Sequence, residues 1–246
     1  MLRTLQGIFI LFAVFSNVVC ADQPDGLLEI KKIADDVFLH TSYKELPDYG
    51  LISSNGLVVI NGKDAYIIDT PWPDGDTEKL VQWIADSGFV LKASLSTHFH
   101  DDRAAGIAYL NQHHIDTYAS VLTNQYLADA GSPVATKTFT GKTFSLLDGV
   151  IEVFYPGPGH TYDNVVVWLP QTHTLVGGCL IRSLAANDMG NTTDGSLNDW
   201  ATSVKNIIDA FPEIESVIPG HGSIGGIDLL THTQALARNF SSSGVK

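Results

Sequence analysis

The first part of the chain alternates apolar and polar positions in a pattern that predicts a sheet followed by a helix. Four apolar runs have the length and the flanking turn residues of strands, at residues 28–30, 37–39, 57–59 and 65–68. A helical stripe then predicts a helix over 77–86, capped by Asp74 or Asp76 and ended by Gly88. Between two of the strands, Tyr43–Gly50 contains both Pro and Gly, so we expect an exposed, mobile connection there that covers a binding groove.

Strands and helices alternate in the middle of the chain, with a strand at 90–96, a helix at 104–110, a strand at 116–119 and a helix at 123–129. The pattern then returns to strands, at 142–146, 150–154, 165–169 and 174–176. A strongly amphipathic helix over 199–211 and a short strand at 216–218 precede a last helix over 229–240. Two β-rich halves that each finish in helices predict an α+β fold, a pair of sheets sandwiched between helical layers.

Residues 1–20 have the features of a secretory signal peptide. Arg3 supplies the positive start, an apolar segment follows, and small residues precede Ala21. The apolar segment is too short to span a membrane, although lipidation of Cys20 is an alternative to simple cleavage. We therefore expect a periplasmic protein in which residues 21–246 form a single domain, without stable membrane association.

Composition agrees with this prediction and narrows the choice of partners. The chain has 246 residues, of which 44% are apolar, enough for a sizeable core. Its formal charge is −13, and loss of Arg3 with the signal peptide makes it −14, which disfavours nucleic acid and anionic membranes as partners. Cleavage after Cys20 leaves Cys179 as the only cysteine, so no internal disulfide can form. A lone thiol is prone to oxidation in an oxidising compartment, and binding to a metal would protect it. We expect a monomer.

Metal-ligating residue types are concentrated in the segment 96–103, between the strand at 90–96 and the helix at 104–110. His98 and His100 project to the same side of an extended chain and can reach one cation, whereas Asp102 lies beyond them and could serve a second cation. The alternative is an ordinary helix start with Asp101 or Asp102 as cap and two incidental histidines.

Three further candidate ligands occupy similar positions beside glycine at strand ends: His160, Cys179 and His221. With the first three they make six ligands, which divide into two three-ligand zinc sites with room for water. The remaining histidines do not lie in comparable motifs, and we interpret them as surface or packing residues: His40, His113, His114, His173 and His232.

These motifs together resemble the class B metallo-β-lactamases of subclass 1, over essentially the whole mature chain. They are His98-x-His100-x-Asp102, Gly159-His160-Thr161, Gly177-Gly178-Cys179 and Gly220-His221-Gly222. The resemblance implies an αββα sandwich, two Zn²⁺ ions per chain, and zinc-dependent hydrolysis of the β-lactam ring of penicillins, cephalosporins and carbapenems, which gives antibiotic resistance. It also implies that His98, His100 and His160 hold one zinc, and that Asp102, Cys179 and His221 hold the other.

The resemblance further implies roles for residues around the metals. Asp102 and Asn191 are the expected catalytic residues, and the substrate would be bound by Arg182, Asn191 and Trp72. Arg103 and Asp69 are expected to support the metal ligands from behind. This chain has Arg182 where the family usually has lysine, and arginine binds a carboxylate bidentately but with a different reach.

Two rival functions are disfavoured by particular residues. Thioester hydrolases of the glyoxalase type have a further histidine directly after the metal-binding aspartate and an aspartate in place of the cysteine, but this chain has Arg103 and Cys179 there. A purely structural zinc site would be closed by four protein ligands, whereas the sequence offers three and three. A serine nucleophile is also disfavoured, because the chain has no Gly-x-Ser-x-Gly motif.

Overall fold

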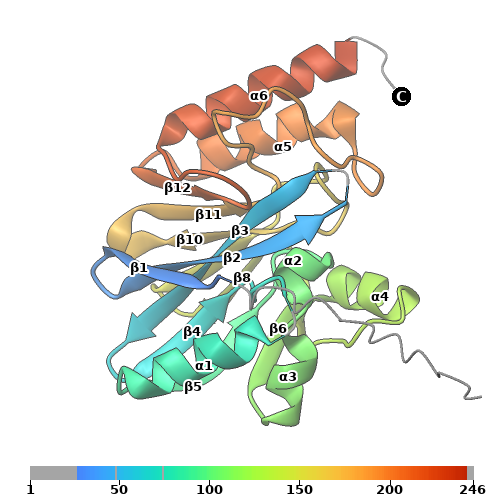
Figure 1. The fold of residues 1–246 in the computed structure, drawn as a ribbon. Helices are drawn as coiled ribbons and strands as arrows, with labels where there is room; N and C mark the ends of the chain where they lie inside the picture. Colours follow the sequence, from blue (N-terminus) through green and yellow to red (C-terminus); the bar gives the residue numbers. More distant parts are fainter. Residues whose placement is uncertain (1–26, 48, 74, 243–246) are drawn as a thin grey trace, which may run out of the picture.

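The computed structural model describes residues 27–47, 49–73 and 75–242, and two sheets form its centre (Figure 1). The predicted signal peptide, including Cys20, and the predicted helix cap Asp74 lie outside the described residues. Within the described residues, no helix is both long and apolar enough to cross a membrane.

The first sheet has seven strands in the order of the sequence. They are β1 (Glu29–Ala34), β2 (Val37–Leu46), β3 (Gly50–Asn61), β4 (Asp64–Ile68), β5 (Val90–Leu95), β6 (Asp116–Ser120) and β7 (Lys137–Phe139). Strands β1 to β4 pair antiparallel, whereas β4 to β7 pair parallel. Because the parallel strands all point the same way, the segments that follow β4 and β5 emerge at one edge of the sheet.

The second sheet has five strands in the order β12-β11-β10-β9-β8. They are β8 (Thr143–Leu147), β9 (Ile151–Phe154), β10 (Val166–Leu169), β11 (Thr174–Gly178) and β12 (Ser216–Pro219), with a short 3₁₀ helix, η1 (Pro170–Thr172), before β11. β11 and β12 are parallel and the other neighbours are antiparallel. The ends of β11 and β12 therefore also emerge together.

Helices cover the outer face of each sheet, as Figure 1 shows. α1 (Asp76–Asp86), α2 (Asp101–Ala104), α3 (Ile107–Gln112) and α4 (Val121–Asp129) lie with the first sheet, and α5 (Leu197–Ala210) and α6 (Ile227–Ser242) with the second. A core of side chains from both sheets, among them Leu57, Val59, Val167 and Val176, fills the space between them. This arrangement is the predicted αββα sandwich, and the predicted fold class is confirmed.

Three local predictions were wrong. The Tyr43–Gly50 connection is mostly strand, because β2 continues to Leu46 and pairs with β3 as far as Leu46 opposite Gly50. The helix predicted over 104–110 is broken, since Gly106 lies against Thr70 so closely that a Cβ would come within 2.8 Å of the Thr70 side chain.

The third wrong prediction is Asp76 as a helix cap. Asp76 is the first residue of α1, and its carboxylate binds Lys79 Nζ at 3.0 Å. Gly75 takes the cap position in a left-handed conformation.

Candidate metal centre

Three histidine side chains meet where β5 ends and the chain turns into α2. His98 Nε2 lies 3.2 Å from His100 Nδ1, which lies 3.1 Å from His160 Nε2. His98 and His160 are buried and His100 is half-buried, and donor atoms of all three lie within 4.8 Å of one another. The sequence pair 98 and 100 and the distant His160 thus form one compact set, here called the three-histidine set.

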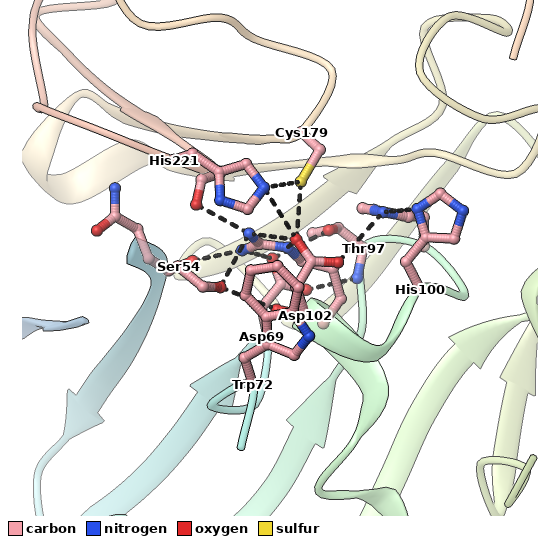
Figure 2. A network of polar contacts seen from close by, with 12 residues as sticks. Ser54, Asp69, Trp72, Thr97, His100, Asp102, Cys179 and His221 are labelled. Atoms are coloured by element: carbon pink, nitrogen blue, oxygen red, sulfur yellow. Dashed lines mark hydrogen bonds and ion pairs between the residues drawn. The ribbon is translucent and has the colours of Figure 1, made fainter. Parts of the chain in front are cut away.

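Asp102, Cys179 and His221 form a second compact set (Figure 2). Asp102 Oδ2 is 3.1 Å from Cys179 Sγ and 3.2 Å from His221 Nε2, and the sulfur is 3.3 Å from the same nitrogen. Asp102 lies on α2, whereas Cys179 and His221 follow β11 and β12. A Cβ on Gly220 would lie 2.6 Å from Cys179 Sγ, so only glycine fits beside this cysteine.

The two sets adjoin each other. His98 Nε2 is 3.9 Å from Asp102 Oδ1, and donor atoms of His98, Asp102 and Cys179 also lie within 4.8 Å of one another. Two cations bound by the two sets would therefore be neighbours.

The donor atoms fit zinc. Ligand atoms at about 2.0–2.3 Å from a tetrahedral Zn²⁺ lie roughly 3.3–3.8 Å apart. The donor separations of 3.1–3.3 Å within the sets are close to that range. Imidazole nitrogen, thiolate and carboxylate are also the ligand types that zinc takes. Each set supplies three donors and leaves a position for water or substrate.

Backbone and carboxylate acceptors fix which nitrogen of two histidines faces the centre. His100 Nε2–H donates to Asp194 Oδ2 at 3.0 Å, so His100 presents its Nδ1 lone pair to the other histidines. His221 Nδ1–H donates to the Ser53 carbonyl at 2.6 Å, so Nε2 faces Asp102 and Cys179. The sequence did not reveal Asp194 or Ser53, since neither lies in a motif.

Arg103 lies fully buried beneath the second set and binds Asp102. Its Nε and Nη2 donate to Asp102 Oδ2 at 3.1 and 2.9 Å, and Nη2 also donates to the Gly220 carbonyl at 2.9 Å and to Ser54 Oγ at 3.1 Å. The Asn55 carbonyl accepts from Nη1. One guanidinium thus connects β3, α2 and the turn after β12.

Charges and burial oppose each other in the second set. Burial would raise the pKa of Asp102, but Arg103 and His221 outweigh it and hold that pKa well below its usual value. Burial raises the pKa of the Cys179 thiol well above its usual value, although Arg103 acts in the other direction. With only protein groups around it, Cys179 is therefore a thiol, and a bound cation is needed to make it a thiolate ligand.

The three-histidine set is suited to neutral imidazoles. Burial lowers the pKa of His98 well below its usual value and that of His160 to about 3, and the neighbouring histidines add to both effects. Neutral imidazole is the form that binds a metal.

Asp69 supports this region from directly after β4, where its backbone is left-handed with φ 60°. Its carboxylate accepts from Thr97 N–H at 2.7 Å and Thr97 Oγ at 3.0 Å, and it lies 3.4 Å from Arg103 Nη1. Burial raises the pKa of Asp69 to about 6, with Arg103 opposing the shift. Asp69 and Arg103 both therefore lie behind the turn that carries the candidate ligands.

Comparison with known proteins identifies the family. The model of the metallo-β-lactamase superfamily matches residues 49–221. The chain belongs to the metallo-β-lactamase superfamily. It is 40% identical to a metallo-β-lactamase type 2 of Pseudomonas aeruginosa, over 93% of this chain and 92% of that protein, and 33% identical to one of Bacteroides fragilis, over 98% and 100%. The solved structure of TMB-1 is similar with a TM-score of 0.85 and 51% identity, over 87% of this chain and 98% of that one.

In this metallo-β-lactamase fold, a pocket of about 230 Å³ opens beside His221, lined by Leu51, Ile52, Ser53, Ile181, Arg182, Ser183, His221 and Gly222. Arg182, an expected substrate ligand, therefore lies at the metal centre. Its Nε and Nη2 are engaged by Asp188, each at 3.2 Å. Trp72, another expected substrate ligand, has its ring centre 5.9 Å from that of His221.

Asn191, another expected site residue, forms its side-chain hydrogen bond within its own loop. It is exposed, and its side-chain oxygen accepts from the Thr193 N–H at 3.1 Å within its own loop. Within the described residues it makes no hydrogen bond to the six candidate ligands. The described hydrogen bonds of Asn191 therefore do not connect it to the candidate ligands.

The remaining histidines lie outside both sets. His40 is buried against the Asp69 carbonyl, His232 Nε2 donates to the Ala186 carbonyl at 2.8 Å, and His173 lies 3.4 Å from Glu215 at a turn. His113 stacks on Tyr109 at the end of α3, and His114 follows it in a left-handed conformation.

Proposed function

We propose that the protein is a zinc-dependent β-lactamase that hydrolyses the lactam ring of penicillins, cephalosporins and carbapenems. The observation that carries the proposal is the pair of adjoining three-donor sets beside an open pocket, in a chain whose relatives are named metallo-β-lactamases. Such an enzyme confers antibiotic resistance on the cell that makes it. It acts on a small molecule, and no nucleic-acid partner is proposed.

The proposed cofactor is two zinc ions per chain. His98, His100 and His160 would hold one, and Asp102, Cys179 and His221 the other. The metallo-β-lactamase FIM-1 of Pseudomonas aeruginosa was solved in a mono-zinc form. It is 35% identical to this chain over 87% of this chain and 96% of that one, with a TM-score of 0.84. Metal analysis of this chain therefore tests the number of zinc ions. Bound zinc supplies Lewis-acid chemistry, since it lowers the pKa of water to about 7 and polarises a carbonyl oxygen.

The side chains around the ligands divide the remaining work. Asp102, kept ionised by Arg103, accepts a hydrogen bond from the attacking water and so orients it. The Asn191 amide donates to the lactam carbonyl oxygen as negative charge develops there. Arg182 pairs with the substrate carboxylate, and Trp72 packs against its apolar parts. Arg103 and Asp69 hold the turn that carries Asp102 in position.

The proposal includes a location and an assembly state. Residues 1–20 would direct the chain to the periplasm and be removed, leaving residues 21–246 as one domain and a monomer. β-Lactams act on targets outside the inner membrane, so a periplasmic enzyme would meet them first.

The decisive experiment measures hydrolysis of a chromogenic cephalosporin and a carbapenem, with and without a chelator. Turnover that the chelator abolishes and added zinc restores is the expected result. Cys179→Ser should lose one of the two zinc ions by metal analysis and most turnover, while His173→Asn, a histidine outside both sets in a left-handed turn, should keep both ions. A covalent acyl-enzyme detected by mass spectrometry, or turnover that resists chelation, would refute the mechanism.

A further inference from the structure

Three alternate residues of β2 contact the segment that follows β4. His40 Nε2 donates to the Asp69 carbonyl at 2.9 Å, and Ser42 Oγ accepts from the Trp72 N–H at 2.9 Å. Lys44 Nζ lies 5.4 Å from the centre of the Trp72 ring, within the range of a cation–π contact. Since side chains two apart in a strand point to one face, β2 presents Lys44 on the same side as His40 and Ser42.

The Lys44 ammonium stands close to the metal centre. Lys44 pairs with Ile52 across the hairpin, and the next residue of β3, Ser53, accepts the hydrogen bond from His221 Nδ1. The Trp72 ring, which Lys44 contacts, has its centre 5.9 Å from that of the His221 ring. The two distances place the ammonium at most about 11 Å from the His221 ring centre, a distance that a bicyclic lactam with an acyl side chain can span.

Lys44 differs from Arg182 in having no anionic partner within the described residues. Arg182 is bound by Asp188 through two of its nitrogens, and it lines the pocket beside His221. Lys44 and Trp72 do not line that pocket, so the two cations reach the centre from different positions. A half-buried lysine held over an aromatic ring can exchange the weak ring contact for a stronger ion pair.

We propose that Lys44 selects substrates that carry a second carboxylate, on the acyl side chain. The inference rests on the proposed β-lactamase function, in which Arg182 takes the carboxylate that all these substrates share. The chain has 14 basic and 27 acidic residues, so a dianionic substrate is repelled on approach unless a local cation receives its extra charge. Lys44 is that cation, and Trp72 holds it in position when no substrate is bound.

The test compares two penicillins with the same nucleus, one with a carboxylate on its acyl side chain and one with a neutral phenyl group there. The measured quantity is the ratio of their kcat/KM values, dianionic over monoanionic. Lys44→Met should lower this ratio roughly three- to fivefold, the effect of losing one partly exposed ion pair, and mainly through KM of the dianionic substrate. Lys44→Arg, which keeps the charge, should keep the ratio within about twofold.

Lys63→Met is the matched control for net charge. Lys63 is exposed in the turn before β4, at the end of that strand opposite to Asp69. Replacing it with methionine therefore makes the same change in net charge at a site away from the metal centre. An unchanged ratio in Lys44→Met, an equal loss for both penicillins, or the same fall in Lys63→Met would overturn the inference. If the wild type hydrolyses neither penicillin, the proposed function itself fails, and this inference fails with it.

Discussion

Acid should destabilise the folded chain through His40, a histidine that takes no part in the metal centre. Its ring is 1% exposed, and Nε2–H donates to the Asp69 carbonyl at 2.9 Å. The other nitrogen, Nδ1, has no hydrogen-bond partner within the described residues, so a proton added there would bring an unpaired charge into the core. Burial accordingly lowers the pKa of His40 from 6.5 to about 3.

The direction of the pH effect on stability follows from proton binding at His40 in the folded and the unfolded chain. The unfolded chain binds a proton at His40 near pH 6.5, whereas the folded chain does not bind it until about pH 3. The stability associated with the neutral ring is therefore present above pH 6.5 and is lost progressively as the pH falls toward 3. At about 1.36 kcal/mol per pH unit, the free energy of unfolding should fall by about 2 kcal/mol between pH 7 and pH 5 through this residue alone.

Urea unfolding of the wild type and of His40→Gln at pH 7 and pH 5 measures this contribution. Glutamine keeps a donor for the Asp69 carbonyl but does not titrate. Both proteins would contain the same excess of zinc, so that titration of the metal-ligating histidines cancels in the comparison. The wild type should lose about 2 kcal/mol more than the variant between the two pH values. An equal loss in both proteins would show that the buried ring is not the cause.

Three further predictions concern the metal centre and the pocket. Asp194→Ala should weaken zinc binding by the three-histidine set about ten- to a hundredfold, because His100 loses the acceptor that orients its ring. Competition with a chromophoric chelator measures the zinc affinity, and an unchanged affinity would contradict the prediction. Arg182→Ala should lower kcat/KM about ten- to a hundredfold, because the substrate loses a charge-assisted contact worth roughly 1.5–3 kcal/mol. A loss below about twofold would mean that another cation binds the substrate carboxylate. Shortening the Tyr43–Gly50 hairpin to a tight turn should raise KM while zinc content stays the same, and an unchanged KM for every substrate would exclude it from binding.

The grouping of the six candidate ligands was predictable because its signals in the sequence are local. His98, His100 and Asp102 stand within five positions, and the other three candidates each adjoin glycine at a strand end. The structure brings all six together. Asp194 could not be found in this way, because 94 residues separate it from His100 and nothing in the sequence around it marks a metal site.

Two of the wrong predictions also have their cause in contacts with other segments. Pro47 and Gly50 suggested that all of Tyr43–Gly50 is irregular, yet pairing with β3 extends the strand as far as Leu46. The break near Gly106 depends on close contact with Thr70, which lies 36 residues earlier in the sequence. Pairing with the neighbouring strand decided the first outcome, and contact with a segment far away in the sequence decided the second. Neither apolar periodicity nor turn residues report such contacts.

Each candidate ligand set draws on both halves of the chain, so a bound ion would act as a cross-link. His100 and His160 lie 60 positions apart, and Asp102 and Cys179 lie 77 positions apart. A covalent link that closes loops of this size removes about 4 kcal/mol of conformational freedom from the unfolded chain. Cys179 is a free cysteine, so metal coordination would take the place that disulfides have in many exported proteins. Zinc scarcity would then shorten the lifetime of the folded protein as well as stop its chemistry, because proteases would reach the unlinked chain more often.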